Sequence, residues 1–181
     1  MNDRTVLLNP GPVTLSAGVR AALVSGDWCH REPEFADLTG SINRRLVDVY
    51  CADQSRYACV LLTGSGTCAV EAMLATHAPR DTTTLVVANG VYGERMAKML
   101  VQLGRPHEVL QAQWTAAIDL DAVAERLRGE SRITHVIAVQ HETTTGRLND
   151  IDALGRLCAQ HDVALLLDSV SAFGAEEIRF E

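Results

Sequence analysis

The sequence predicts an α/β fold in which a mainly parallel sheet lies between two layers of helices. After an irregular opening of about fifty residues, short apolar runs alternate with segments of helical periodicity, which is the pattern of repeated strand–helix units. The apolar runs are not interrupted by regularly spaced polar residues, so helices should cover both faces of each strand. These two observations indicate a three-layer α/β/α domain.

The opening is predicted to contain a proline-rich turn and two helices. Asn9-Pro10-Gly11-Pro12 cannot continue a helix and predicts an extended arm or turn. Residues 16–24 should form a short helix capped by Ser16, and residues 34–50 should form a longer one. The longer helix has apolar residues at helical spacing, namely Phe35, Leu38, Ile42, Leu46 and Val49.

The rest of the chain is predicted to alternate regularly between strands and helices. The predicted strands cover residues 58–63, 84–88, 107–110, 134–139 and 163–167. The predicted helices cover residues 67–76, 92–103, 119–128 and 150–161. Because parallel strands end at one edge of a sheet, the loops that follow them should form a ligand-binding crevice.

The composition excludes several classes of function. The 181 residues are 47% hydrophobic and 22% charged, which suits one ordinary folded core. The net charge of -7 and the scattered arginines argue against a nucleic-acid partner, and no apolar run is long enough to span a membrane. Five cysteines without a Cys-x-x-Cys pair, and the lack of a signal-peptide pattern, predict reduced thiols and a cytoplasmic location.

The glycine loop at residues 64–67 predicts a phosphate site. Ser65, Gly66 and Thr67 begin a predicted helix, where backbone N–H groups, two hydroxyls and the helix dipole all favour an anion. The same residues match the dinucleotide pattern G-x-G-x-x-A, but strand 84–88 does not end in the acid that would bind a ribose. A plain strand-to-helix turn with a serine cap stays an alternative.

Asp168 ends a run of three leucines and is predicted to be a buried acid. A buried carboxylate needs a partner, and a protonated ring nitrogen would be one. The alternatives are that Asp168 caps the next turn or binds a metal. No His-Glu-x-x-His motif or other cluster with metal-ligand spacing occurs in the sequence, so a metal is the weaker of the two.

Two further loops at predicted strand ends carry suitable groups. Tyr92 follows strand 84–88 and could lie against a flat ring, although a lone loop aromatic more often packs into a core. Thr143 follows strand 134–139 in a threonine-rich turn, which could also serve only local backbone bonds. Several loops of one edge therefore carry groups that suit a phosphorylated, nitrogen-containing ring.

These motifs resemble the class V aminotransferases of fold type I, which use pyridoxal 5'-phosphate (PLP). The resemblance rests on residues 9–12, 29–35, 62–67, 89–95, 141–146 and 168–174. It implies that Ser65, Gly66 and Thr67 bind the cofactor phosphate and that Asp168 pairs with the pyridine nitrogen. It also implies that Tyr92 stacks on the ring, that Val170 packs beneath it and that Thr143 bonds near the ring hydroxyl. Small-molecule amine and 2-oxo acid substrates and a homodimer are implied as well.

The chain departs from the family at its lysines. Family members carry a Schiff-base lysine beyond the segment that matches Phe173-Gly174, followed by a small C-terminal domain. The sequence contains a single lysine, Lys98, within the predicted helix 92–103. The resemblance therefore covers the N-terminal half, with residues 1–52 as an arm with helices and residues 53–181 as a partial PLP-binding large domain.

The substrates are less strongly indicated than the cofactor. Segments 28–35 and 141–147 resemble family members that move an amino group from 2-aminoethylphosphonate to pyruvate, giving phosphonoacetaldehyde and alanine. His30 and Arg31 could meet an anionic substrate group, but Arg31 beside Glu32 could equally form a surface ion pair. The open alternatives are an alanine–glyoxylate or serine–pyruvate aminotransferase, a non-catalytic PLP-binding or dimerising remnant, and a dinucleotide-binding oxidoreductase.

Overall fold

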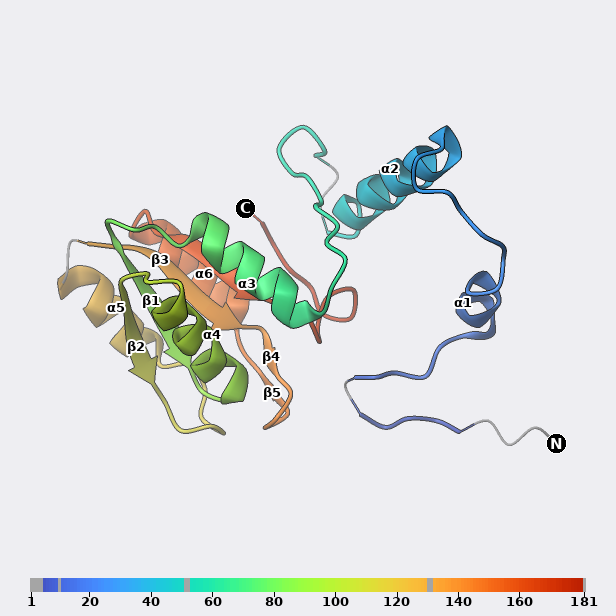
Figure 1. The fold of residues 1–181 in the computed structure, drawn as a ribbon. Helices are drawn as coiled ribbons and strands as arrows, with labels where there is room; N and C mark the ends of the chain where they lie inside the picture. The colour runs from blue at the N-terminus through green and yellow to red at the C-terminus, as the bar shows by residue number, and fades with distance from the viewer. Residues whose placement is uncertain (1–4, 10, 51–52, 130–131, 181) are drawn as a thin grey trace. The chain divides into compact units, whose positions relative to one another are not determined.

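The computed structural model describes residues 5–9, 11–50, 53–129 and 132–180. Pro10 of the predicted proline-rich turn, and Cys51, one of the five cysteines, lie outside these ranges. The chain divides into an N-terminal unit, residues 1–61 with 180–181, and a sheet unit, residues 62–179 (Figure 1). Each unit is described by itself.

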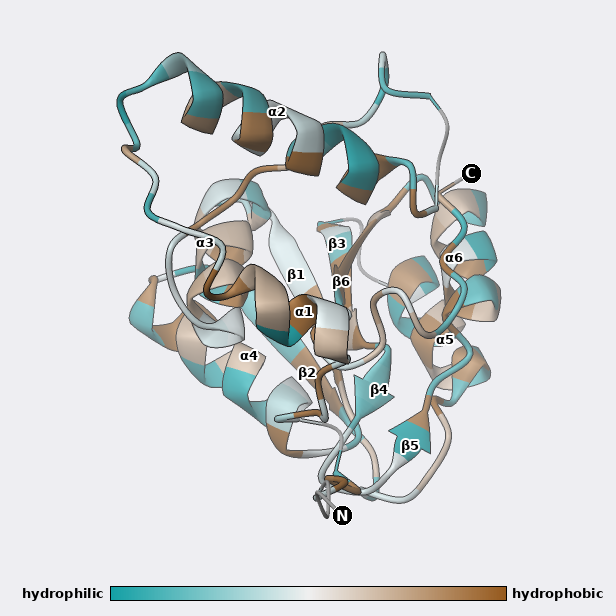
Figure 2. Cartoon of the chain, turned by 90° about the vertical axis from the view of Figure 1, so that its right-hand side faces the viewer, coloured by the Kyte–Doolittle hydropathy of each residue, from teal (hydrophilic) through white to brown (hydrophobic). Residues whose placement is uncertain are grey.

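The N-terminal unit contains the two predicted helices. Helix α1 (Ala17–Ala22) begins after Ser16, whose hydroxyl accepts a hydrogen bond of 3.2 Å from the Val19 N–H. Helix α2 (Pro33–Val47) has a proline at its first position, where no intrahelical N–H bond is lost. Neither helix has a buried residue, and the apolar residues of α2 gather along one side of it (Figure 2).

The sheet unit is built on four parallel strands in the order β2-β1-β3-β6. The strands are β1 (Thr83–Ala88), β2 (His107–Gln111), β3 (Ile133–Val139) and β6 (Ala164–Asp168). The helices are α3 (Gly66–His77), α4 (Val91–Gln102), α5 (Leu120–Gly129) and α6 (Ile151–Gln160). A short antiparallel hairpin, β4 (His141–Glu142) with β5 (Arg147–Leu148), follows β3.

The two faces of the sheet carry two separate apolar cores. Val86 and Ile137 pack with residues of α3 and α4, whereas Leu85 and Val136 pack with residues of α5 and α6. In Figure 1, α3 and α4 accordingly lie on one side of the sheet, and α5 and α6 lie on the other. Neighbouring residues of one strand point to opposite faces, so helices on both sides explain why the strands are apolar throughout. The predicted three-layer α/β/α fold is confirmed.

One predicted strand is wrong. Residues 58–63 form no strand in the described part of the chain, and Val60, Leu61 and Leu62 are exposed, with Val60 at 78%. A strand needs a neighbour to complete its backbone hydrogen bonds, and no described strand pairs with this segment. An apolar run alone therefore did not suffice to form a strand. The hairpin β4–β5 was predicted only as a threonine-rich turn.

Gly93 in the first turn of α4 packs against β1 and gives a test of the fold. A Cβ atom at Gly93 would lie 2.8 Å from the Cα of Ala88, which is backbone and has little freedom to move. Gly93→Ala is therefore expected to lower the free energy of unfolding, measured in urea, by about 1–3 kcal/mol. Gly155→Ala is the matched control, because its Cβ would meet only Leu165 at 3.9 Å. That variant should gain about 0.5–1 kcal/mol.

Candidate functional site

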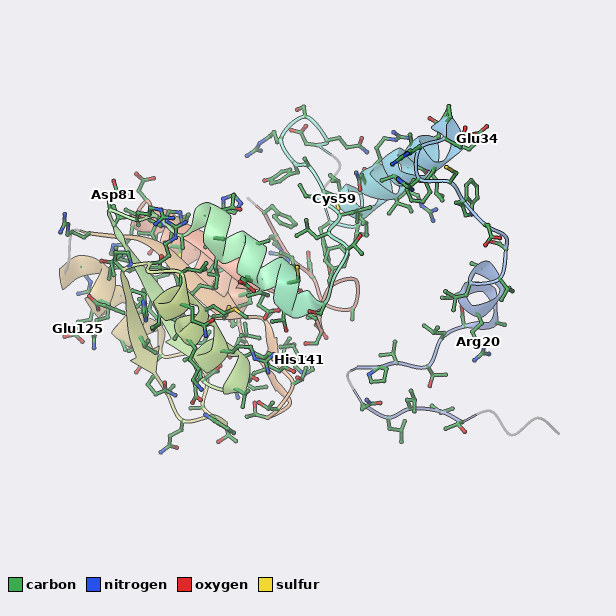
Figure 3. The ribbon with its side chains drawn as sticks, in the orientation of Figure 1. Arg20, Glu34, Cys59, Asp81, Glu125 and His141 are labelled. Carbon is green, nitrogen blue, oxygen red and sulfur yellow. The ribbon has the colours of Figure 1, made fainter. Side chains whose placement is uncertain are left out.

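The site lies where the parallel strands of the sheet unit end. The loops that follow β1, β3 and β6 leave the sheet at one edge, and the N-terminus of α3 meets them there. A Cβ at Gly66, the first residue of α3, would lie 2.9 Å from the Val170 methyl groups. The Ser171 hydroxyl donates a 3.0 Å hydrogen bond to the carbonyl oxygen of His141. His141, which is labelled in Figure 3, is the first residue of β4.

The glycine loop forms the N-terminus of α3. Ser65 is the N-cap residue, and its hydroxyl oxygen accepts a 3.3 Å hydrogen bond from the Cys68 N–H. This is the helix cap that the plain-turn interpretation predicts. The cap does not use the hydroxyl proton of Ser65, and the first N–H groups of a helix have no partner within it. The same loop can therefore cap its own helix and donate to an anion.

Asp168 is a buried acid, with 8% of its surface exposed. Its Oδ1 accepts a 3.0 Å hydrogen bond from the Val170 N–H, so it does cap the next turn. Burial raises the pKa of Asp168; the Val170 hydrogen bond lowers the pKa, the Glu142 charge raises it and the Arg95 charge lowers it. Burial is the largest of these effects, so the pKa of Asp168 is raised despite the Val170 hydrogen bond and the Arg95 charge.

Both the backbone and the ring of Tyr92 contact other residues of the site. Its N–H donates a 3.1 Å hydrogen bond to Oε2 of Glu142, which is fully buried. The Arg95 guanidinium carbon lies 4.8 Å from the centre of the Tyr92 ring, and Arg95 donates a 3.4 Å hydrogen bond to the Thr67 hydroxyl. Arg95 therefore links the glycine loop to Tyr92.

Two buried asparagines fix the loops relative to one another. Asn89 follows β1, and its side-chain amide donates a 2.8 Å hydrogen bond to the Asn149 side chain. Asn149 in turn donates to the carbonyl oxygen of Val139, the last residue of β3, at 2.9 Å. A third bond, of 2.6 Å from Ser169 to Gln140, ties the loop after β6 to that after β3. Buried polar groups bonded in this way hold an edge rigid.

The remaining predicted residues have different surroundings. Thr143 is half-buried in the β4–β5 hairpin, and Val170 is 65% exposed. His30 and Arg31 are exposed residues of the N-terminal unit, so their part in substrate binding stays a prediction. Lys98 is exposed on α4.

The sequence interpretation missed Glu142 and Arg95 as members of the site. Both residues lie within motifs that suggested the family, but nothing in their local pattern indicates a partner. Glu142 contacts a backbone group 50 residues away, and Arg95 contacts a side chain 28 residues away. Glu142 occurs between two polar residues in a loop, which is the pattern of a solvated acid, yet it is fully buried.

Other possible sites give weaker indications. Among the described residues there is no group of three metal-binding side chains, and Cys29, Cys59, Cys68 and Cys158 are free. None of the described helices combines the length and the apolar character that crossing a membrane requires.

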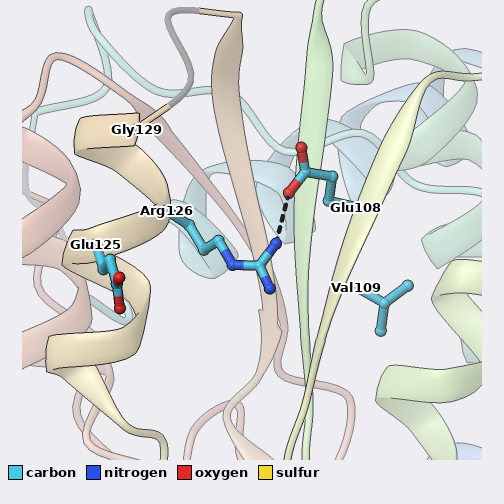
Figure 4. A pocket seen from close by; sticks show the side chains of 5 residues that line it. All are labelled: Glu108, Val109, Glu125, Arg126 and Gly129. Carbon is cyan, nitrogen blue, oxygen red and sulfur yellow. Dashed lines mark hydrogen bonds and ion pairs between the residues drawn. The ribbon is translucent and has the colours of Figure 1, made fainter.

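A pocket of about 580 Å³ between β2 and α5 is lined by Glu108, Val109, Glu125, Arg126 and Gly129 (Figure 4). Its exposed ion pair between Arg126 and Glu108 is of a kind that contributes little.

Asp168 should make the stability of the cofactor-free protein depend on pH. Its folded-state pKa lies above the ordinary value of 3.8, so folding favours the protonated form. The resulting stabilisation is complete below pH 3.8 and is lost as the pH rises through the folded pKa. Asp168→Asn removes this dependence. Urea unfolding at a series of pH values should show that the free energy of unfolding of the unsubstituted protein falls, relative to that of the variant, as the pH rises. A difference between the two proteins that stays constant with pH would contradict the raised pKa of Asp168.

Fold and site together define an α/β domain whose candidate ligand-binding groups lie at the carboxyl edge of a parallel sheet. The family model for aminotransferase class-V matches residues 43–181. The chain belongs to the class V aminotransferase family.

Two curated relatives and one solved structure show the extent of the similarity. The 2-aminoethylphosphonate–pyruvate transaminase of Pseudomonas putida (strain GB-1) is 39% identical over 189 residues, covering 100% of this chain and 50% of that protein. The transaminase of the same name from Burkholderia ambifaria (strain MC40-6) is 42% identical over 170 residues, covering 94% and 45%. The structure of pyridoxamine-pyruvate aminotransferase from Mesorhizobium loti matches with a TM-score of 0.89 and 28% identity, covering 98% of this chain and 44% of that one. The chain thus spans about half the length of the curated relatives it matches.

Proposed function

We propose that this chain supplies the PLP-binding part of an aminotransferase that moves an amino group from 2-aminoethylphosphonate to pyruvate. The products would be phosphonoacetaldehyde and alanine. The similarity to curated transaminases of that name, at 39% and 42% identity, supports the substrates. The observation that carries the chemistry is the buried carboxylate of Asp168 at the same sheet edge as the N-terminus of α3.

The residues at this edge fit PLP. The N-terminus of α3 offers backbone N–H groups and the Ser65 and Thr67 hydroxyls to a phosphate. Gly66 lets Val170 lie close to this helix start, because a Cβ there would lie 2.9 Å from the Val170 methyl groups. Oδ1 of Asp168 is bonded to Val170, and its Oδ2 has no hydrogen-bond partner among the described residues, which leaves one carboxylate oxygen for a cationic ring nitrogen.

Each residue would have a distinct role in binding. Bound PLP supplies an electron-withdrawing ring that stabilises negative charge at the substrate carbon. Asp168 would hold a proton at the ring nitrogen, because its negative charge stabilises the protonated, cationic form of that nitrogen. Tyr92 and Val170 would contact the ring, and Thr143 would donate towards its hydroxyl group. Residues 53–181 would then form part of the PLP-binding large domain.

Other properties are proposed from the family resemblance. The protein would act as a homodimer in the cytoplasm, without nucleic-acid or membrane partners. Free thiols at the four described cysteines are consistent with a reducing compartment. Burial raises the pKa of Cys158 to about 11, so this thiol is protonated and unreactive at neutral pH.

A graft tests the proposed function. The chain would replace the matching first half of the Pseudomonas putida transaminase, and alanine formation from 2-aminoethylphosphonate and pyruvate would be measured. We expect alanine to form far faster than in the same graft with Asp168→Asn. Equal rates in the two grafts would contradict the role of Asp168. Faster transfer from alanine to glyoxylate than from 2-aminoethylphosphonate to pyruvate would favour the alanine–glyoxylate alternative.

Replacing Asp168 should also change the bound ring itself. In the chain loaded with PLP, Asp168→Asn is expected to lower the pKa of the ring nitrogen by about 1–3 units, since a neutral amide does not stabilise a cation. Nitrogen NMR of isotopically labelled PLP measures this pKa directly. Asp81→Asn, an exposed carboxylate before β1, is the control and should leave it unchanged. An unchanged pKa in Asp168→Asn would show that another group contacts the nitrogen.

A further inference from the structure

Glu142 is a buried acid without a basic partner. None of its surface is exposed, and no described side chain forms a salt bridge with it. Its Oε2 accepts hydrogen bonds from the Tyr92 N–H at 3.1 Å and the Gly93 N–H at 3.4 Å, and its Oε1 accepts one of 2.8 Å from the Thr144 hydroxyl. A buried carboxylate is costly unless such donors stabilise it.

Two of these three donors, the N–H groups of Tyr92 and Gly93, come from the first turn of α4, which lacks a side-chain cap of its own. The N-cap residue is Gly90, which has no side chain to bond the free N–H groups. Glu142 supplies the missing acceptor from 50 residues further along the chain, and its charge also suits the positive end of the helix dipole. The glycine makes this possible, because a Cβ at Gly90 would clash with the Cγ of Glu142.

The first turn of α4 determines the position of Tyr92. Tyr92 is the second residue of the helix, and Glu142 binds its backbone N–H directly. A loss of this cap would free the turn to fray, and the Tyr92 ring would move with it. The contacts of the ring with Arg95, and of Arg95 with Thr67, would then loosen as well.

We propose that Glu142 is a positioning residue for the cofactor ring: it caps α4 from across the sheet edge and so holds the Tyr92 ring in place for stacking on PLP. This inference rests on the proposed PLP site. The Glu142 charge also acts on Asp168, where it raises the pKa together with burial, against Arg95 and the Val170 N–H. Glu142 thus contacts one ring-binding residue and acts electrostatically on another.

The first test needs no cofactor. Amide hydrogen exchange of Tyr92 and Gly93, followed by NMR, should speed up in Glu142→Ala and to a lesser degree in Glu142→Gln, which keeps one oxygen acceptor. Glu94→Gln is the matched control. It also removes a carboxylate, from the same helical turn, but that carboxylate accepts hydrogen bonds from Gln111 and Trp114 and not from the N–H groups of the turn. Unchanged exchange in both Glu142 variants would overturn the capping role.

The second test uses PLP as the probe. We expect PLP to bind about 3- to 30-fold more weakly to Glu142→Ala than to the unsubstituted chain, as loss of a helix cap implies. The circular dichroism of bound PLP, which reports how firmly the ring is held, should also decrease. If the unsubstituted chain binds PLP and both Glu142 variants match its affinity and dichroism, only the positioning role is wrong. If the unsubstituted chain binds no PLP, the proposed function fails and this role fails with it. Should Glu142→Ala not fold, Glu142→Gln carries both tests.

Discussion

The 181-residue chain, mixed with PLP, 2-aminoethylphosphonate and pyruvate, is expected to form alanine no faster than free PLP does. Amino transfer needs an amine that can be held uncharged beside the cofactor aldehyde and can then move protons. The sequence contains one lysine, Lys98, which is exposed on α4. It lies six residues after Tyr92, or roughly 9 Å further along the helix at about 1.5 Å per residue. We therefore expect that the site residues of this chain do not complete the reaction by themselves.

Borohydride reduction followed by peptide mapping measures this directly. Reduction fixes any amine that has condensed with the PLP aldehyde, so the expected result is no stoichiometric adduct at Lys98. The graft with the second half of the Pseudomonas putida relative is the positive control for the alanine assay. A stoichiometric adduct at Lys98, together with alanine formation by the chain alone, would show that these residues form a complete catalytic site.

The helices were predictable because their signals are local. Ser16, Ser65 and Asp150 each cap a helix by accepting a hydrogen bond from the N–H three residues later. Such a pattern can be read from neighbouring residues. The strands that are buried on both faces were equally predictable from the sequence, because each is a short apolar run between helices. Residues 58–63 have the same local pattern, yet no described strand pairs with them, and pairing is not a local property.

The candidate site was predictable to the extent that it depends on strand ends. Asp168 and Tyr92 follow apolar runs, and parallel topology alone brings such positions to one edge. The contacts between these positions were not predictable. Glu142 as a cap of α4 and Arg95 as a link to Thr67 both depend on how two loops pack, which no spacing in the sequence records.

Removing both hydroxyls of the glycine loop is expected to weaken PLP binding by roughly 10- to 100-fold for each charge-assisted hydrogen bond that is lost. The design must separate this effect from helix capping, because Ser65 also caps α3. Alanine at a cap position costs about 0.5–2 kcal/mol of stability, whereas glycine costs only a few tenths. The variant of choice is therefore Ser65→Gly with Thr67→Ala, in which the change of cap costs α3 only a few tenths of a kcal/mol and the backbone N–H groups are kept.

Pyridoxal, which has the same ring without the phosphate, separates a phosphate site from a general ring site. The unsubstituted chain should bind PLP much more tightly than pyridoxal, and the double variant should lose most of that difference while its affinity for pyridoxal stays the same. Thr76→Ala, an exposed threonine at the other end of α3, is the matched control and should change neither affinity. Equal affinity of the unsubstituted chain for the two compounds would refute the phosphate role, because the donors at the α3 N-terminus act on the phosphate and not on the ring. A parallel loss of both affinities in the double variant would instead mean that the loop supports the ring, and the phosphate would then have to bind elsewhere.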